Sequence, residues 1–200
     1  MKKFLTRFGR FGIILILFLL VLPISGSAGD FSADMINKSP MGTIKGKAFS
    51  KKGNFRQEMV MGGRNQITIF RKDKKLIWML MPEQKMYMEM DGSGGQNMSP
   101  VDLDELKKVG KMEYLGKEKI NGYECSKYRF THKDASLGTG IYWISEKLNF
   151  PIKMEMDGPS GHMVTEYRNI NEKTVPDDFF NIPSGYQKMS MPMMPGMQKQ

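Results

Sequence analysis

The sequence predicts a mainly β fold, a curved antiparallel sheet of about eleven strands that forms a half-barrel with one short helix as a partial lid. Three observations support this prediction. Apolar and polar residues alternate with period two from Phe31 onward. Turn signals such as Asn121-Gly122 separate the runs at short intervals. One run, 76–81, is apolar on both faces and needs cover on both sides. A single twisted sheet of this size curls and encloses an apolar concavity.

The first residues predict a secretory signal. A basic start is followed by an apolar run at 11–22 and by the small residues 26–28. At about 1.5 Å per residue the run spans roughly 18 Å, short of the ~30 Å hydrocarbon core, which favours cleavage near Ala28 over a retained anchor. We therefore expect an exported, soluble periplasmic protein with three segments: a signal peptide (1–28), a half-barrel domain (29–188) and a disordered Met-rich tail (189–200).

The alternation places the strands in order along the mature chain. They are expected at residues 31–37, 43–50, 54–61, 66–71, 75–81, 85–90, 111–117, 123–132, 139–145, 151–157 and 162–171. Ser99 as N-cap, Pro100 at the first helical position and Asp102 in the first turn predict the helix, near 99–108. With the Gly-rich loop at 92–96, this helix forms a movable lid in our interpretation. The stretch 175–186 is expected to pack back on the sheet as irregular structure.

Charge and cysteine content exclude some function classes. The formal net charge is +9, but after the signal the cations are scattered among acids, which argues against nucleic acid binding and leaves transient membrane contact open. One Cys and two His are too few for a disulfide framework and leave few ligands for a zinc site. Cys125 is interpreted as a buried thiol on a strand, with an intermolecular disulfide as the alternative.

Several motifs resemble the LolA-like periplasmic lipoprotein carriers. The stretches 31–33, 45–49 and 53–59 resemble the opening strands of these carriers, and 78–87 resembles their paired strands around a Pro-containing turn. Three further stretches are closer to an uncharacterised bacterial family of the same fold: 122–125, 148–154 and 179–186. The likeness runs over nearly the whole mature chain.

The resemblance implies a half-barrel with helices closing its concave side, where the carriers receive lipoprotein acyl chains. This chain departs from the carriers at its start, because Phe31 lies three residues past the predicted cleavage and leaves no room for their first helix. The lid is therefore reduced, and we do not transfer the carriers' opening and closing. Fold transfers better than function.

Methionine is the anomaly of this composition, with 20 residues. Thioethers on unbranched stems adapt to irregular partners and recur on promiscuous binding surfaces. Burying an acyl chain of ~16 carbons is worth on the order of 10 kcal/mol before ordering costs. We expect a hydrophobic ligand, lipid or lipoprotein acyl chains, in a concave cavity; a plain Met-filled core is the alternative. The expected ligand-binding residues are Met59, Met61, Trp78, Met79, Met81, Met86, Met88, Met90, Met154 and Met156.

Two other functions stay open. The same sulfurs are soft ligands that select Cu(I), and the tail would add thioethers from Met189, Met191, Met193, Met194 and Met197. An envelope sensor or adaptor could use the same fold to recognise a partner. Catalysis is not expected, because no base lies near a nucleophile in the sequence pattern and no phosphate loop is present. We expect no cofactor.

Overall fold

The computed structural model describes residues 29–93 and 103–189. Its strands, in chain order, are β1 (Phe31–Ser39), β2 (Gly42–Lys51), β3 (Asn54–Met61), β4 (Arg64–Arg71), β5 (Leu76–Met81), β6 (Met86–Asp91), β7 (Gly110–Ile120), β8 (Tyr123–His132), β9 (Thr139–Ser145), β10 (Phe150–Gly158), β11 (Gly161–Asn171) and β12 (Gln187–Lys188). The helix α1 covers Leu103–Val109, and short 3-10 helices lie at Pro82–Gln84, Ala135–Leu137 and Asp177–Phe180.

All twelve strands belong to one open sheet. Their order across the sheet is β12-β6-β5-β4-β3-β2-β1-β11-β10-β9-β8-β7. Strands that follow one another in the chain are neighbours from β1 to β6 and from β7 to β11, and β1 joins the two halves by pairing antiparallel with both β2 and β11. The eleven expected strands are present. The twelfth, β12, was not expected, and it pairs parallel with β6 at one edge.

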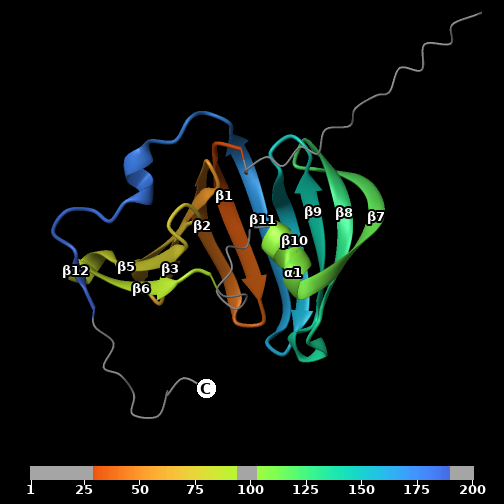
Figure 1. The fold of residues 1–200 in the computed structure, drawn as a ribbon, viewed down its shortest axis with the longest axis horizontal. Helices are drawn as coiled ribbons and strands as arrows, with labels where there is room; N and C mark the ends of the chain where they lie inside the picture. The colour runs from red at the N-terminus through yellow and green to blue at the C-terminus, as the bar shows by residue number, and fades with distance from the viewer. Residues whose placement is uncertain (1–28, 94–102, 190–200) are drawn as a thin grey trace, which may run out of the picture.

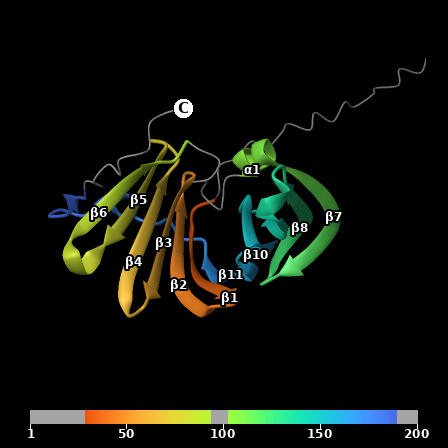
Figure 2. The same cartoon turned by 90° about the horizontal axis from the view of Figure 1, so that it is seen from below.

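The sheet is curved, and α1 lies on its inner side. Figure 2 shows the sheet bending from β6, next to the edge strand β12, round to β7 at the other edge, with α1 at the opening between them. Leu106 of α1 is buried in the cluster that also contains Phe31 and Phe130. The predicted fold class, a mainly β half-barrel, is confirmed. The signal peptide, residues 99–102 of the expected helix and the tail beyond Met189 lie outside the described residues.

Tight turns with left-handed backbone join neighbouring strands, as Figure 1 lets the reader follow along the chain. Asn121 and Gly122 between β7 and β8 have φ of 49° and 88°, and Lys52 and Gly53 between β2 and β3 have φ of 50° and 82°. Two successive residues with positive φ match the right-handed twist of a hairpin, which is why Asn and Gly occur at such turns. The sequence therefore specifies these connections locally.

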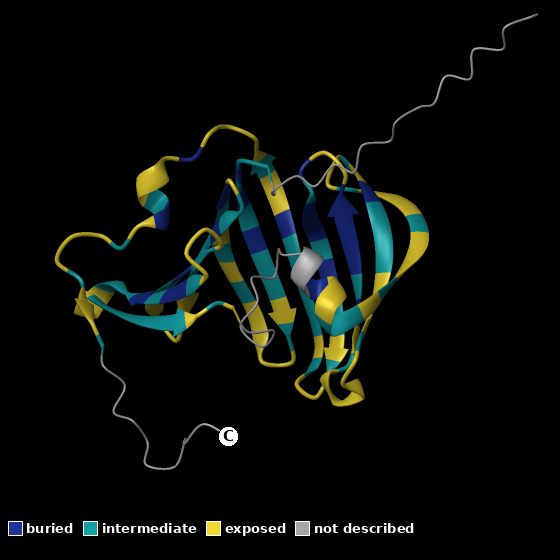
Figure 3. Cartoon of the chain, in the orientation of Figure 1, coloured by how far each residue is buried: buried dark blue, intermediate teal, exposed yellow. Residues whose placement is uncertain are grey.

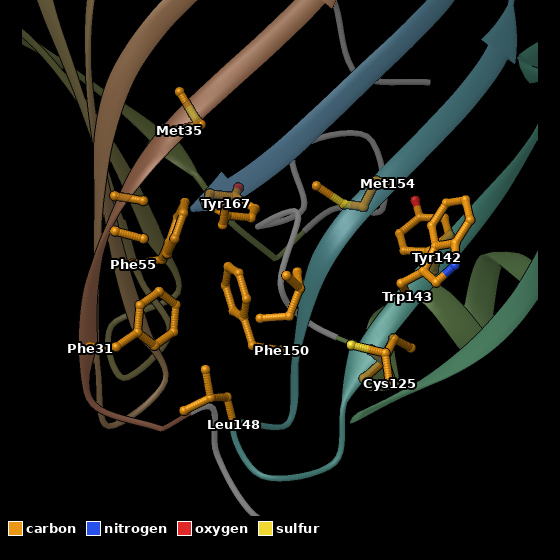
Figure 4. Close-up of a cluster of buried hydrophobic side chains, with 14 of the residues drawn as sticks. Phe31, Met35, Phe55, Cys125, Tyr142, Trp143, Leu148, Phe150, Met154 and Tyr167 are labelled. Carbon is orange, nitrogen blue, oxygen red and sulfur yellow. The ribbon is translucent and has the colours of Figure 1, made fainter. Parts of the chain in front are cut away.

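An aromatic cluster fills the centre of the inner face. The rings of Phe31 and Phe150 pack edge to face with centroids 4.7 Å apart, and Tyr167 packs on Phe150 at 4.9 Å. Phe55, from β3, packs on the rings of Phe150 and Tyr167, which come from β10 and β11 (Figure 4). The exposed fraction of each of these four side chains is at most 1%. Burying a side chain of this size contributes about 1.5–3 kcal/mol, so this aromatic cluster stabilises the junction between the two halves of the sheet.

The outer face of β2–β5 is covered by the segment after β11. Val175 and Phe180 are buried there against Ile69, Trp78 and Leu80. Three cations hold the segment through its backbone carbonyl oxygens: Lys51 donates to Val175 (2.6 Å), Arg56 to Phe179 (2.8 Å) and Arg71 to Phe180 (2.8 Å). The expectation that the stretch 175–186 packs back on the sheet is confirmed, and it covers the outer face of β5. On the inner face of β5, Ile77 is buried, whereas Met79 and Met81 are half-buried. Figure 3 shows buried residues on both arms of the sheet.

Candidate functional site

The strand register brings the β3 methionines to the inner face. Phe55, a member of the aromatic cluster, pairs with Phe70, which packs against the buried core. Met59 and Met61 have the same parity as Phe55 on β3, so they point to the same side, whereas Val60 between them points outward. Met59 packs against the aromatic cluster. Gly46, its partner on β2, leaves room for it, because the Met59 Cγ lies 3.1 Å from where a Cβ of residue 46 would be.

Four methionines of β5 and β6 oppose one another in two directly paired positions. Met79 pairs with Met88, and Met81 pairs with Met86. Directly paired residues on antiparallel strands have Cβ atoms about 4.5–5.5 Å apart. Met90 continues the row opposite Ile77. We call the four paired residues the methionine square: Met79, Met81, Met86 and Met88.

The other half of the sheet carries a second group of methionines. Met154 and Met156 lie on β10 and pair with Thr165 and Met163 of β11. Met156 lies over Gly140 of β9, where a Cβ would collide with its sulfur. Met163 was not among the expected site residues, although it has the same parity as Thr165 and Tyr167 in the expected strand at 162–171.

Burial separates most of these methionines from the core. Met154 is 6% exposed and belongs to the buried cluster, whereas Met61 is 43% exposed at the end of β3. The others are half-buried: Met59, Met79, Met81, Met86, Met88, Met90 and Met156. The aromatic cluster therefore supplies the core, and most of the methionines form a partly accessible apolar surface beside it. We call this set, with Met61, the methionine surface.

Trp78 does not share this surface, which corrects its place among the expected ligand-binding residues. It alternates with Ile77 and Met79 on β5, so its ring lies on the outer face, where it is buried with Val175 and Phe180. Its indole N–H donates to Glu89 Oε2 (2.9 Å), and the Arg71 guanidinium lies 5.4 Å from its ring centroid. Trp78 is thus part of the seal between β5 and the C-terminal segment.

Charged groups are concentrated away from the centre of the methionine surface. The inner positions between the methionines of β3 and β5 are neutral, namely Gln57, Gln66 and Thr68. Arg64, at the start of β4 opposite Met61, marks the margin of this surface. On the inner side of β9, burial raises the pKa of Tyr142 to about 12, so this phenol stays neutral. The surface is therefore suited to an apolar ligand.

Cys125 is a buried thiol, as expected. It is fully buried within the cluster around Phe150, and burial raises its pKa to about 11. A thiol that stays protonated at neutral pH is a poor nucleophile and a poor metal ligand. Its role in the structure is packing.

Only the first of the tail methionines proposed as copper ligands lies within the described residues. Met189 donates its backbone N–H to the Tyr87 carbonyl oxygen (2.8 Å), continuing the β12 pairing along the β6 edge. Met191, Met193, Met194 and Met197 lie outside. Among the described residues no group of three or more His, Cys, Asp or Glu side chains is placed to hold a metal ion. In the same part of the chain, no helix combines the length and apolar character that a membrane span requires.

Solved structures with a similar fold come from several bacterial proteins. An uncharacterised conserved protein from Thermus thermophilus has a TM-score of 0.56 and 10% identity, over 81% of this chain and 90% of that chain. MucB from Pseudomonas aeruginosa, solved in complex with MucA, has a TM-score of 0.50 and 12% identity over 76% of this chain and 55% of that chain. This chain thus spans little more than half of MucB. Likenesses at this identity show the fold alone.

A LolA superfamily protein from Nitrosomonas europaea is also similar, with a TM-score of 0.38 and 13% identity over 78% of this chain and 91% of that chain. A search of curated proteins returns no match to this sequence. Of the resemblances in the sequence, the one to an uncharacterised bacterial family is confirmed by a family model. The family model described as a domain of unknown function, DUF4412, matches residues 32–149, more than half of the chain. The chain belongs to the DUF4412 family.

Proposed function

We propose that this protein is a non-catalytic binding or carrier protein of the bacterial envelope. Its ligand is the acyl chain of a lipid or lipoprotein, and it binds to the methionine surface on the inner face of the half-barrel. The observation that carries the proposal is the division of the inner face into a fully buried aromatic cluster and a half-buried methionine surface. A plain core would bury both groups alike.

The chemistry of the methionine surface favours a flexible apolar ligand. A Met side chain has three rotatable bonds and a polarisable sulfur, so it can follow a chain of variable shape. Transfer of one ~16-carbon chain from water is worth on the order of 10 kcal/mol before ordering costs, which is enough for stable uptake. Neutral Gln57 and Thr68 between the methionines impose no desolvation of charge.

Two further observations support the envelope location and the class of function. The first 28 residues have the layout of a secretory signal. The fold is shared with MucB, a protein whose structure was solved with a partner, MucA. That likeness also keeps a second candidate, a sensor or adaptor that recognises a protein partner. In that case the methionine surface would take up no lipid.

The first experiment is native mass spectrometry of the mature chain purified without detergent. A heterogeneous adduct in the lipid mass range is expected. A bare protein mass after gentle handling would contradict the carrier proposal and favour the adaptor, which would then be sought by crosslinking in cells.

A variant pair then localises the binding. M86D/M88D places two charges on the methionine surface and should abolish binding of cis-parinaric acid, a fluorescent fatty acid, because a carboxylate strongly disfavours apolar contact. The matched control is V60D, a charge on the opposite face at a side chain that is 56% exposed. Equal binding by M86D/M88D and V60D, with both folded by circular dichroism, would exclude this surface as the binding site.

A further inference from the structure

The methionine square has a feature that an acyl chain does not require. Its four thioethers come from two adjacent antiparallel strands and from two consecutive inner positions on each strand. Positions two apart on a strand are separated by about 7 Å, and directly paired positions by about 5 Å. Because each Met side chain has three rotatable bonds, all four sulfurs can reach one point above the centre of the square.

The chemistry of this group of donors is selective. Thioethers are soft and uncharged, and among biological metals they favour Cu(I), whereas Zn²⁺ and Mg²⁺ prefer imidazole, thiolate or carboxylate ligands. The nearest side chain in the same row is Thr68, which pairs with Met79 and is neutral. Glu89, on the same strand, points to the outer face, where it accepts hydrogen bonds from Trp78 and Lys188. No carboxylate therefore competes for the centre of the square among the described residues.

Half-burial of the square suits a site that must exchange its metal. All four side chains are partly accessible, so a copper carrier or a small chelator can reach the sulfurs. The structure differs here from the β10 group, where Met154 is buried in the hydrophobic core and Met156 is opposed by Gly140 and Met163. The β10 group thus offers a matched set of methionines in a different geometry.

We propose that the methionine square is a Cu(I)-binding site, formed by the sulfur atoms of β5 and β6 alone. The site requires neither the tail beyond Met189 nor the ligand proposed above, although it occupies part of the same surface. Cu(I) binds as such, with no change of oxidation state. Copper and an acyl chain would then compete for β5 and β6.

The test is a competition titration of the lipid-free mature protein with Cu(I) under anaerobic, reducing conditions, with bicinchoninate as the competing chelator. We expect the wild type to withdraw Cu(I) from the chelator in a stoichiometric complex, and X-ray absorption to show a sulfur coordination shell. M79L/M81L/M86L/M88L should lose this complex. Leu conserves apolar volume at each position, so the fold should survive. If this quadruple variant does not fold, the double variant M79L/M88L, with one ligand removed from each strand, replaces it.

Two controls make the assignment specific. M154L/M156L removes two thioethers from β10 and should bind Cu(I) as the wild type does, and a chain truncated after Met189 should do the same. Retention of the Cu(I) complex by the square variant, or its loss on truncation of the tail, would overturn the proposal. Absence of any complex in the wild type would also overturn it.

The copper test is independent of the lipid test. The Leu substitutions keep the surface apolar, so the square variant should still bind cis-parinaric acid while losing Cu(I). Failure of the wild type to bind fatty acid, with its Cu(I) binding intact, would reject the carrier function and leave the metal site standing.

Discussion

The aromatic cluster and the methionine surface share one face of the sheet but differ in almost every physical respect. The rings of Phe31, Phe55, Phe150 and Tyr167 interlock edge to face and are shielded from water. The methionines of β5 and β6 lie at the same inward parity, yet stay half-buried. The difference shows that strand parity decides which face a side chain occupies, whereas neighbouring strands decide how deeply it is buried.

The largest effect is expected in the aromatic cluster. Phe150→Ala should lower the free energy of unfolding by about 3–5 kcal/mol, because it removes the ring that Phe31, Phe55 and Tyr167 all contact. Met88→Leu should change it by less than about 1.5 kcal/mol. Chemical denaturation of both variants measures the two values. Similar losses in both would mean that the methionine surface is core, which would break the distinction.

A smaller loss of stability is expected at Gly46, where the aromatic cluster and the methionine surface meet. Gly46→Ala should lower the free energy of unfolding by about 1–3 kcal/mol, because the new Cβ collides with the Glu58 backbone carbonyl oxygen on β3 and also approaches Met59. Thermal unfolding of this variant measures the effect. Gly62→Ala is the comparison. Gly62 has open space around it but φ of 57°, so any loss there comes from backbone strain and not from a steric clash. An unchanged midpoint in Gly46→Ala would show that β2 and β3 can move apart freely at this point.

The outer face of β5 and β6 should respond to acid while the methionine surface does not. Hydrogen bonds from Lys188 and then from Trp78 lower the pKa of Glu89. A lowered pKa in the folded state contributes stability that is present above the ordinary Glu pKa of about 4.3 and is lost as pH falls through the folded value. In Trp143→Phe, which keeps Trp78, the Trp78 fluorescence should therefore change below about pH 4. Adding Glu89→Gln should remove this change, and its persistence would assign the transition to another group.

The smallest effect on stability is expected at the end of β3. Met61→Asp and Val60→Asp both place a carboxylate at an exposed position, 43% and 56% exposed, so each should change stability by no more than about 0.5 kcal/mol. Only Met61→Asp should weaken fatty-acid binding, because only it faces inward. Fluorescence titration with cis-parinaric acid measures both variants under the same conditions. Equally weakened fatty-acid binding in both variants would mean that the net charge of the protein, and not the inward face, controls binding.

The eleven longer strands could be predicted from the sequence, because alternation and turn residues act locally. β12 could not, since Gln187 and Lys188 carry no alternating pattern and the strand exists only through pairing with the β6 edge. Its backbone partners are supplied by Lys85 and Tyr87, which are distant in sequence. Trp78 has the opposite parity to Met79 and Met81 in the run 76–81, so the sequence pattern itself separates its side chain from the methionines.

For the candidate site, the sequence predicts which face of the sheet each methionine occupies, but not how deeply its side chain is buried. The methionine pairs on β5 and β6 follow from period two, whereas their direct opposition depends on the register set by the turn around Pro82–Gln84. The half-buried state of the square depends on which residues lie beside it in the folded sheet, and strand parity does not reveal this. Met154 shows the same limit, since its pattern resembles that of Met88 but its surroundings bury it.

The pairing of β1 with β11 at the centre of the sheet fixes the order in which the chain can fold. The Asn37 side-chain amide donates to the Thr165 hydroxyl (2.9 Å), a contact between residues 128 apart in sequence. Contacts at such separation form late, after local hairpins, because closing a long loop costs entropy. The half-barrel therefore cannot be completed until β11 has been synthesised. A nascent chain of this topology therefore remains an open, incomplete sheet for most of its synthesis.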